Sequence, residues 1–197
     1  MSTISVEPLS HTEVARRPLR GEDCVLSVID IQDKLLPAIW EKERVVRNSQ
    51  LLIRLALLLD IPIVASAQYR KGLGETVPEI ASLMPDVKVV DKLEFGCFGN
   101  ADFCAKTASL AGRNTQLVCG IEAHICVTQT VLGALNNGHT VHVAADAVSS
   151  RSELNWKIGI ERMRDAGAVI SSTEMMMYEL MGKSGTPVFK EMLKHLK

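Results

Sequence analysis

The chain has 197 residues, which is enough for one α/β domain with a sizeable core and too few for two ordinary domains. Its formal net charge of −1 gives no basic field for nucleic acid and no polybasic patch for a membrane surface. Because 47% of the residues are hydrophobic and only 4% are aromatic, we expect an aliphatic core.

The five cysteines are spread along the chain without a CxxC pair. This usage is typical of a reducing compartment and argues against a disulfide framework or a zinc cluster. Residues 1–20 lack the apolar centre of a signal peptide, and no apolar run is long enough to span a bilayer. The sequence therefore predicts a cytoplasmic protein.

Short apolar runs alternate with helical patterns along most of the chain. Residues 1–21 form a polar arm without periodicity, and residues 22–197 are expected to form a single domain. The expected strands cover residues 23–30, 61–67, 87–90, 116–120, 140–145 and 168–171. Helices are expected at 44–60, 101–111, 125–137 and 153–166, with two further helical pieces at the end. Such alternation predicts a parallel sheet with helices on both faces and right-handed crossovers.

In a sheet of this kind, ligands bind outside the carboxyl ends of the strands. The residues just past the expected strands are Asp30, Gln68, Lys92, Cys126 and Asp146. Cys126 falls in the first turn of a helix that directly follows a buried strand. Unpaired backbone N–H groups and the helix dipole favour a thiolate and a developing oxyanion at such a place.

Three of these residues make a chemical set. Cys126 would be the nucleophile, Asp30 a general base, and Lys92 a cation that orients the carboxylate. Each also has a structural explanation, because a lone cysteine is often a small core residue, an aspartate can cap a helix, and lysines commonly end strands. Cys97, on the loop after Lys92, is left open between a pocket residue and a core residue.

The motifs VIDIQD, VDKLEFGCFGN and GIEAHICV, in this order, resemble the isochorismatase-like hydrolases, a cysteine hydrolase group that includes the nicotinamidases. The resemblance covers the chain from Cys24 to its end. QYRKGLGETVPE and ADAVSSRSE resemble more particularly the isochorismatase domain-containing proteins of undefined substrate, some of which are labelled ribonucleases. The resemblance implies a three-layer α/β/α, Rossmann-like fold with a six-stranded parallel sheet of order 3-2-1-4-5-6. It also implies an Asp30, Lys92 and Cys126 triad and a homodimer or homotetramer.

The same resemblance implies a cis peptide bond, placed here at Glu122–Ala123, that aims backbone N–H groups near Ala123 and Cys126 at an oxyanion. Two features depart from the family pattern. Many relatives have a Thr-Asp or Thr-Glu pair where this chain has Ala123-His124. Nicotinamidases bind a metal through an Asp and two His after the second strand, where this chain reads SAQYRKG. We therefore expect no metal and no other cofactor.

The leading prediction is a small-molecule cysteine hydrolase that cleaves an amide or carbamoyl compound through a thioester. Retention of Cys126 favours this chemistry, because isochorismatases proper can work without the cysteine. The expected substrate-binding side chains are Trp40, Gln68, Tyr69, Phe95 and His124. A ribonuclease is one alternative, opposed by the lack of a basic stripe with interleaved aromatics. A non-catalytic oligomeric scaffold is the other.

Overall fold

Six parallel strands form one sheet in the order β3-β2-β1-β4-β5-β6. The computed structural model describes residues 11–110 and 112–196. The strands are β1 (Cys24–Ile29), β2 (Ile63–Gln68), β3 (Val90–Lys92), β4 (Thr115–Ile121), β5 (Thr140–Ser149) and β6 (Val169–Ser171). The predicted fold class and strand order are confirmed. The order reverses between β1 and β4, so the ligand crevice is expected outside the carboxyl ends of these two strands.

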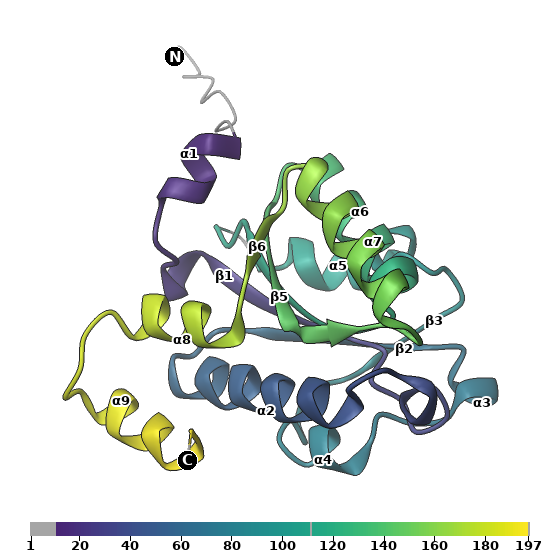
Figure 1. Cartoon of the computed structure of the whole chain (residues 1–197), viewed down its shortest axis with the longest axis horizontal. Coiled ribbons are helices and arrows are strands. Elements are labelled where there is room, and N and C mark those ends of the chain that lie inside the picture. Colours follow the sequence, from purple (N-terminus) through teal and green to yellow (C-terminus); the bar gives the residue numbers. More distant parts are fainter. Residues whose placement is uncertain (1–10, 111, 197) are drawn as a thin grey trace.

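Helices cover both faces of the sheet (Figure 1). One side carries α2 (Lys42–Leu58), α4 (Pro78–Ala81), α8 (Thr173–Met181) and α9 (Pro187–Met192). The other carries α5 (Ala101–Ala108), α6 (Thr128–Asn136) and α7 (Glu153–Asp165). Side chains alternate along β1, so Leu26 and Val28 enter one hydrophobic core while Val25 and Ile29 enter the other. Burial on both faces explains why the strands are nearly continuous apolar runs.

Two strands differ most from their predicted extents. The third strand was expected at residues 87–90, but β3 begins at Val90 because its ladder with β2 pairs Ser66 with Val90 and Gln68 with Lys92. Lys92 is therefore the last residue of the strand. β5 continues four residues beyond its predicted end at Ala145, and its pairing with β4 shifts register between Val118 and Gly120.

The predicted arm at residues 1–21 contains a helix, α1 (His11–Arg16), in its described part. Its first ten residues lie outside the described residues. The Gly-containing loop after β2 likewise includes two short helices, α3 (Arg70–Leu73) and α4. Within the described residues, no helix is both long enough and apolar enough to cross a membrane.

We expect His142 to make the fold sensitive to acid. This residue of β5 is 6% exposed, and burial lowers the pKa of its imidazole from 6.5 to about 4. The unfolded chain therefore binds a proton that the folded chain excludes between these two pH values. As the pH falls from 7 to 4, we expect His142 to remove about 3 kcal/mol from the free energy of unfolding.

Urea denaturation of the wild type and of His142→Gln at both pH values measures this contribution. The wild type should lose more stability than the variant, since other acid-sensitive groups are common to both proteins. Equal losses in the two proteins would show that His142 is not the group responsible.

Candidate active site

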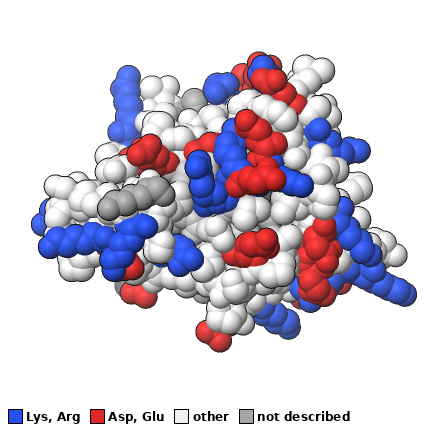
Figure 2. Space-filling model, turned by 60° about the horizontal axis from the view of Figure 1, so that its bottom comes forward, with Lys and Arg blue, Asp and Glu red and all other residues white. Residues whose placement is uncertain are grey.

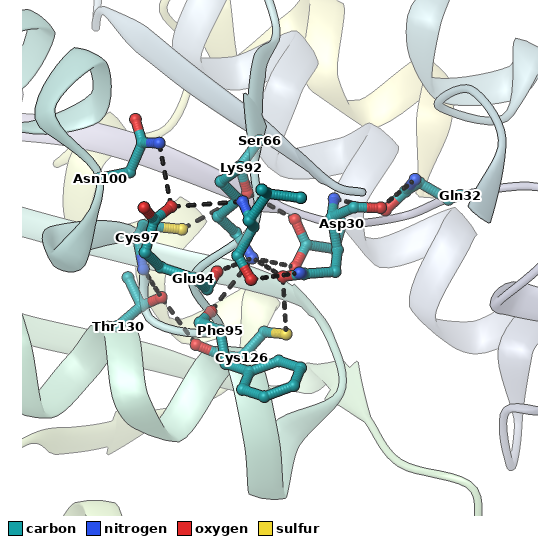
Figure 3. A network of polar contacts seen from close by, with 12 residues as sticks. Asp30, Gln32, Ser66, Lys92, Glu94, Phe95, Cys97, Asn100, Cys126 and Thr130 are labelled. Atoms are coloured by element: carbon teal, nitrogen blue, oxygen red, sulfur yellow. Dashed lines mark hydrogen bonds and ion pairs between the residues drawn. The ribbon is translucent and has the colours of Figure 1, made fainter. Parts of the chain in front are cut away.

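The carboxyl ends of four neighbouring strands bring the predicted residues together. Asp30 directly follows β1, Gln68 ends β2, Lys92 ends β3, and Cys126 lies in the turn after β4. Figure 3 shows Asp30, Lys92 and Cys126 converging on one network of polar contacts. Asp30 has a left-handed backbone with φ of 51°, a strained conformation that non-glycine residues often adopt at functional sites.

Asp30 and Lys92 form a buried ion pair, with 2.7 Å between Lys92 Nζ and Asp30 Oδ2 and both side chains fully buried. Lys92 Nζ also donates to Gln68 Oε1 at 2.6 Å and to the carbonyl oxygens of Glu94 and Phe95 at 3.2 and 3.0 Å. Burial by itself would lower the pKa of Lys92, but the Asp30 carboxylate and the nearby thiols more than offset it, so the pKa is raised. The lysine therefore remains a cation at neutral pH and cannot act as a base.

Cys126 is a neutral thiol in the resting protein. It is 6% exposed, and burial raises the pKa of the thiol to about 12, with the Asp30 carboxylate adding to the shift and Lys92 opposing it. Its sulfur lies 3.9 Å from Gln68 Oε1. The raised pKa runs against the expectation of a thiolate at the helix start, and burial is its largest cause. A base would have to remove this proton before the thiol could act as a nucleophile.

The turn that carries Cys126 is a π-helical segment (Ala123–Val127) that leads into α6, so the helix begins two residues earlier than predicted. Such wide turns are rare and often occur at functional sites. The cis peptide bond joins Ile121 and Glu122, one residue before the predicted Glu122–Ala123 position, which is therefore wrong. The Glu122 carbonyl accepts from the N–H groups of Ile125 at 3.0 Å and Val127 at 3.1 Å. These two donors are thus already occupied.

Gly120, the residue before Ile121, lets β4 approach β1 closely at this edge. Its φ of 124° is one that side chains rarely adopt, and a Cβ atom there would overlap the carbonyl group of Ile29. A glycine is therefore required just where the chain enters the turn.

Gln68 was predicted as a substrate-binding residue, and the structure places its side chain between Lys92 and Cys126. Sequence reasoning missed the residue that holds it, Gln32, which is fully buried. The Gln32 side chain accepts from the Gln68 backbone N–H at 2.7 Å and donates to the carbonyl oxygens of Gln68 and Gly74 at 3.0 and 2.8 Å. Gln32 thereby fixes the end of β2 against the following loop.

We expect Gln32→Ala to lower the free energy of unfolding by about 2–3 kcal/mol, because it removes three hydrogen bonds and leaves buried backbone groups unpaired. Gln50→Ala is the matched control, since Gln50 donates a single exposed hydrogen bond of 2.9 Å to Glu79 O. Urea denaturation should show a loss of less than about 0.5 kcal/mol for that variant. Similar losses in both variants would contradict a special role for Gln32.

The remaining predicted substrate-binding residues lie in different places. Phe95 contributes its carbonyl to the Lys92 network, and the residue is 54% exposed. Tyr69 follows Gln68, donates its N–H to Lys92 O at 2.8 Å and is 48% exposed. Half-buried His124 pairs its Nδ1 with Ser150 Oγ at 2.9 Å. These three residues are suited to the rim of a site.

Trp40 makes different contacts. Its ring packs against Trp156, with 5.6 Å between centroids, and beneath the Arg44 guanidinium at 5.2 Å. Its backbone pairs with Ser149 and Ser150, and none of these contacts reaches Asp30, Lys92 or Cys126. A role for Trp40 in substrate binding stays a prediction. Asp146 is also remote from the network, since its carboxylate instead accepts from the backbone N–H and hydroxyl of Thr173.

Three further buried residues adjoin the network. Ser66 donates to Asp30 Oδ1 at 2.7 Å, and Thr130 donates to the Cys126 carbonyl at 2.7 Å. Cys97, left open by the sequence, is fully buried, and its thiol donates to Ser66 Oγ at 3.4 Å. The sequence could have indicated Ser66 as a site residue, because it precedes Gln68 by two residues and so faces the same side of its strand. Across the described residues, no three His, Cys, Asp or Glu side chains are grouped as metal ligands.

A family profile for the isochorismatase domain matches residues 24–175. The Phytophthora sojae protein named secreted isochorismatase effector Isc1 is 38% identical over 176 residues, covering 88% of this chain and 84% of that protein. Isochorismatase domain-containing protein 2A of Mus musculus is 35% identical over 179 residues, covering 89% and 84% respectively.

Solved structures agree with these sequence matches. The Caenorhabditis elegans protein named MAR1 ribonuclease has a structure with a TM-score of 0.84 and 33% identity, covering 91% of this chain and 92% of that one. Escherichia coli YcaC, described as an octameric hydrolase of unknown specificity, has a TM-score of 0.85 and 22% identity, covering 90% of each chain. The family profile spans most of the chain, and both curated relatives exceed 30% identity over most of their length. The chain belongs to the isochorismatase domain family.

Proposed function

We propose that the chain is a small-molecule hydrolase in which Cys126 is the nucleophile, Asp30 the general base and Lys92 the residue that holds the base. Membership of the isochorismatase family indicates hydrolase activity in general. The observation that carries the finer proposal is the fully buried Asp30–Lys92 ion pair beside an almost buried thiol. Titratable groups whose environments are perturbed in this way gather at active sites.

The first half of the reaction forms a thioester. Asp30 takes the proton from the neutral Cys126 thiol as Sγ attacks the substrate carbonyl carbon, and negative charge moves to the carbonyl oxygen. Because the Ile125 and Val127 N–H groups are occupied by Glu122, the N–H groups of Ala123 and Cys126 are the proposed oxyanion donors. The carbon–nitrogen bond then breaks, and Asp30 gives its proton to the departing amine.

The second half releases the acid. Asp30, again a carboxylate, removes a proton from water as the water oxygen attacks the thioester carbonyl. The carbon–sulfur bond breaks, the proton returns to Cys126, and the carboxylic acid leaves. Lys92 stays charged throughout and prevents the carboxylate from turning away. These steps use side chains and backbone groups of the chain alone, without a metal or other cofactor.

The proposed substrate is a small amide or carbamoyl compound, which would suit a thioester route and a thiol nucleophile. A panel of such compounds, assayed for ammonia release and for an acyl adduct on the Cys126 peptide by mass spectrometry, tests the proposal. The expected result is turnover with an adduct that hydroxylamine removes. Turnover without any adduct at Cys126, or an adduct that forms equally well in Asp30→Asn, would contradict the mechanism.

RNA cleavage is a second candidate, favoured by the likeness to the Caenorhabditis elegans protein that is named a ribonuclease. Against it, the formal net charge is −1, and Figure 2 shows Lys and Arg side chains interspersed with Asp and Glu on the face in view. Nuclease binding should weaken steeply with salt as phosphate contacts are lost. A filter-binding titration at low and high salt that detects no RNA complex at either would remove this candidate.

We further propose a homo-oligomer that binds a small-molecule substrate without nucleic acid or membrane. The octameric Escherichia coli neighbour supports self-association, and the family resemblance implies a dimer or tetramer. Light scattering of the purified chain distinguishes these states from a monomer. A cytoplasmic location stays a prediction, and one relative carries the word "secreted" in its name.

A further inference from the structure

A series of buried hydrogen-bond donors leads to the carboxylate oxygen of Asp30 that does not contact Lys92. Ser66 Oγ donates to Asp30 Oδ1 at 2.7 Å, and Cys97 Sγ donates to Ser66 Oγ at 3.4 Å. Asp30 and Cys97 are 0% exposed and Ser66 is 2% exposed, so water does not compete for these contacts. Lys92 holds the other carboxylate oxygen, Oδ2. Both oxygens of Asp30 are therefore fixed, each by a donor from a different strand.

At its other end, this series of hydrogen bonds reaches the helix that carries Cys126 (Figure 3). The Cys97 backbone N–H donates to Thr130 Oγ1 at 3.0 Å, and the Thr130 hydroxyl donates to the Cys126 carbonyl at 2.7 Å. Thr130 is 1% exposed and lies one helical turn after Cys126. One buried path thus joins the strand of the base, the loop after Lys92 and the helix of the nucleophile.

We infer that Ser66, supported by Cys97, is a positioning residue that orients the Asp30 carboxylate and stabilises it as the base for Cys126. The inference rests on the proposed function, in which Asp30 takes the Cys126 proton. A hydrogen bond donated to a carboxylate favours its ionised form, and hydrogen bonds to charged groups are the stronger kind. Ser66 would therefore stabilise the Asp30 carboxylate in the orientation from which it accepts the Cys126 proton.

The purely structural alternative is that Ser66 only fills a buried position in its strand, with its hydroxyl hydrogen-bonded. Ser27 is a serine in that situation. Ser27 is 1% exposed in β1 and donates one hydrogen bond of 2.8 Å to Gln116 Oε1. It matches Ser66 in residue type, burial and strand setting. Because this hydroxyl donates to Gln116 and not to Asp30, Ser27→Ala controls for loss of a buried serine hydroxyl.

The experiment measures alkylation of Cys126 by iodoacetamide against pH, with peptide mass mapping to separate Cys126 from Cys97. It needs no substrate, because the Sγ–carbon bond forms, iodide leaves and the thiol proton passes to the base. In Ser66→Ala the fall in alkylation rate at low pH should begin about 1 pH unit higher than in the wild type. Alkylation in that pH range should therefore be about tenfold slower. Ser66→Thr, which keeps the hydroxyl, should return the profile to that of the wild type.

Cys97→Ala provides a second test if Ser66→Ala folds poorly, and it should move this fall in rate in the same direction by a smaller amount. Ser27→Ala should leave the profile unchanged. If Asp30→Asn alters the profile while Ser66→Ala and Cys97→Ala both follow the wild type, the inference is overturned and the proposed function stands. If Asp30→Asn also leaves the profile unchanged, Asp30 is not the base, and the proposed function is overturned first.

Discussion

Replacing Cys126 by alanine is expected to reduce hydrolysis of a responsive amide by at least roughly 10⁴-fold, because the route through a thioester disappears. Substrate affinity should change far less, since the Ala123 N–H group and the rim residues remain. Ammonia release under saturating substrate measures the first quantity, and competition against wild-type turnover measures the second. The fold should persist, because alanine fits wherever the cysteine did and loses only one sulfur atom.

Cys119→Ala is the matched control for this prediction. Cys119 is a fully buried thiol in β4, and its sulfur makes a weak contact of 3.8 Å with the Ser27 carbonyl oxygen. This variant should keep wild-type turnover while losing a similar packing contact. An alanine variant at position 126 within tenfold of wild-type turnover would end the thioester mechanism. Hydrolysis by a water molecule that Asp30 activates directly would then be the mechanism to test.

The sequence was most informative where backbone topology alone decides position. Asp30 and Cys126 follow apolar runs that had to be central strands, and the carboxyl ends of neighbouring parallel strands meet at one edge. Lys92 was placed correctly in that group, although its strand was predicted at residues 87–90 and β3 lies at Val90–Lys92. Its pairing with β2 depends on register, which a short run such as VKVV does not specify.

The electrostatic state of Cys126 could not be predicted in the same way. A helix start favours a thiolate less when the thiol is buried, and here the thiol is 6% exposed and next to a carboxylate, whose effects exceed that of the Lys92 cation. Burial depends on how α6 and the Lys92 loop pack together, which no local pattern contains. Gln32 and Ser66 were missed for a related reason, since their importance lies in partners 36 residues away in the chain.

Replacing Lys92 by methionine is expected to lower the free energy of unfolding by about 3–5 kcal/mol, because the Asp30 carboxylate is left buried without its counter-ion. Urea denaturation at pH 7 measures the loss. Lys157→Met is the matched control, since it breaks a 2.7 Å ion pair with Glu153 whose side chains are more than half exposed. That exposed pair should be worth less than about 1 kcal/mol. Equal losses of stability in Lys92→Met and Lys157→Met would mean that burial does not raise the cost of breaking the ion pair.

The double variant Asp30→Asn with Lys92→Met separates stability from chemistry. A buried ion pair is costly to desolvate, so removing both charges should restore most of the stability that Lys92→Met loses. Cys126 in the double variant should nevertheless be far slower to alkylate at pH 7 than in the wild type, because no base remains to accept its proton. Recovered stability with lost thiol reactivity would indicate that the pair is retained for chemistry. A double variant as unstable as Lys92→Met would instead assign the pair to the fold, where four oxygens around one ammonium hold the loop after β3 in place.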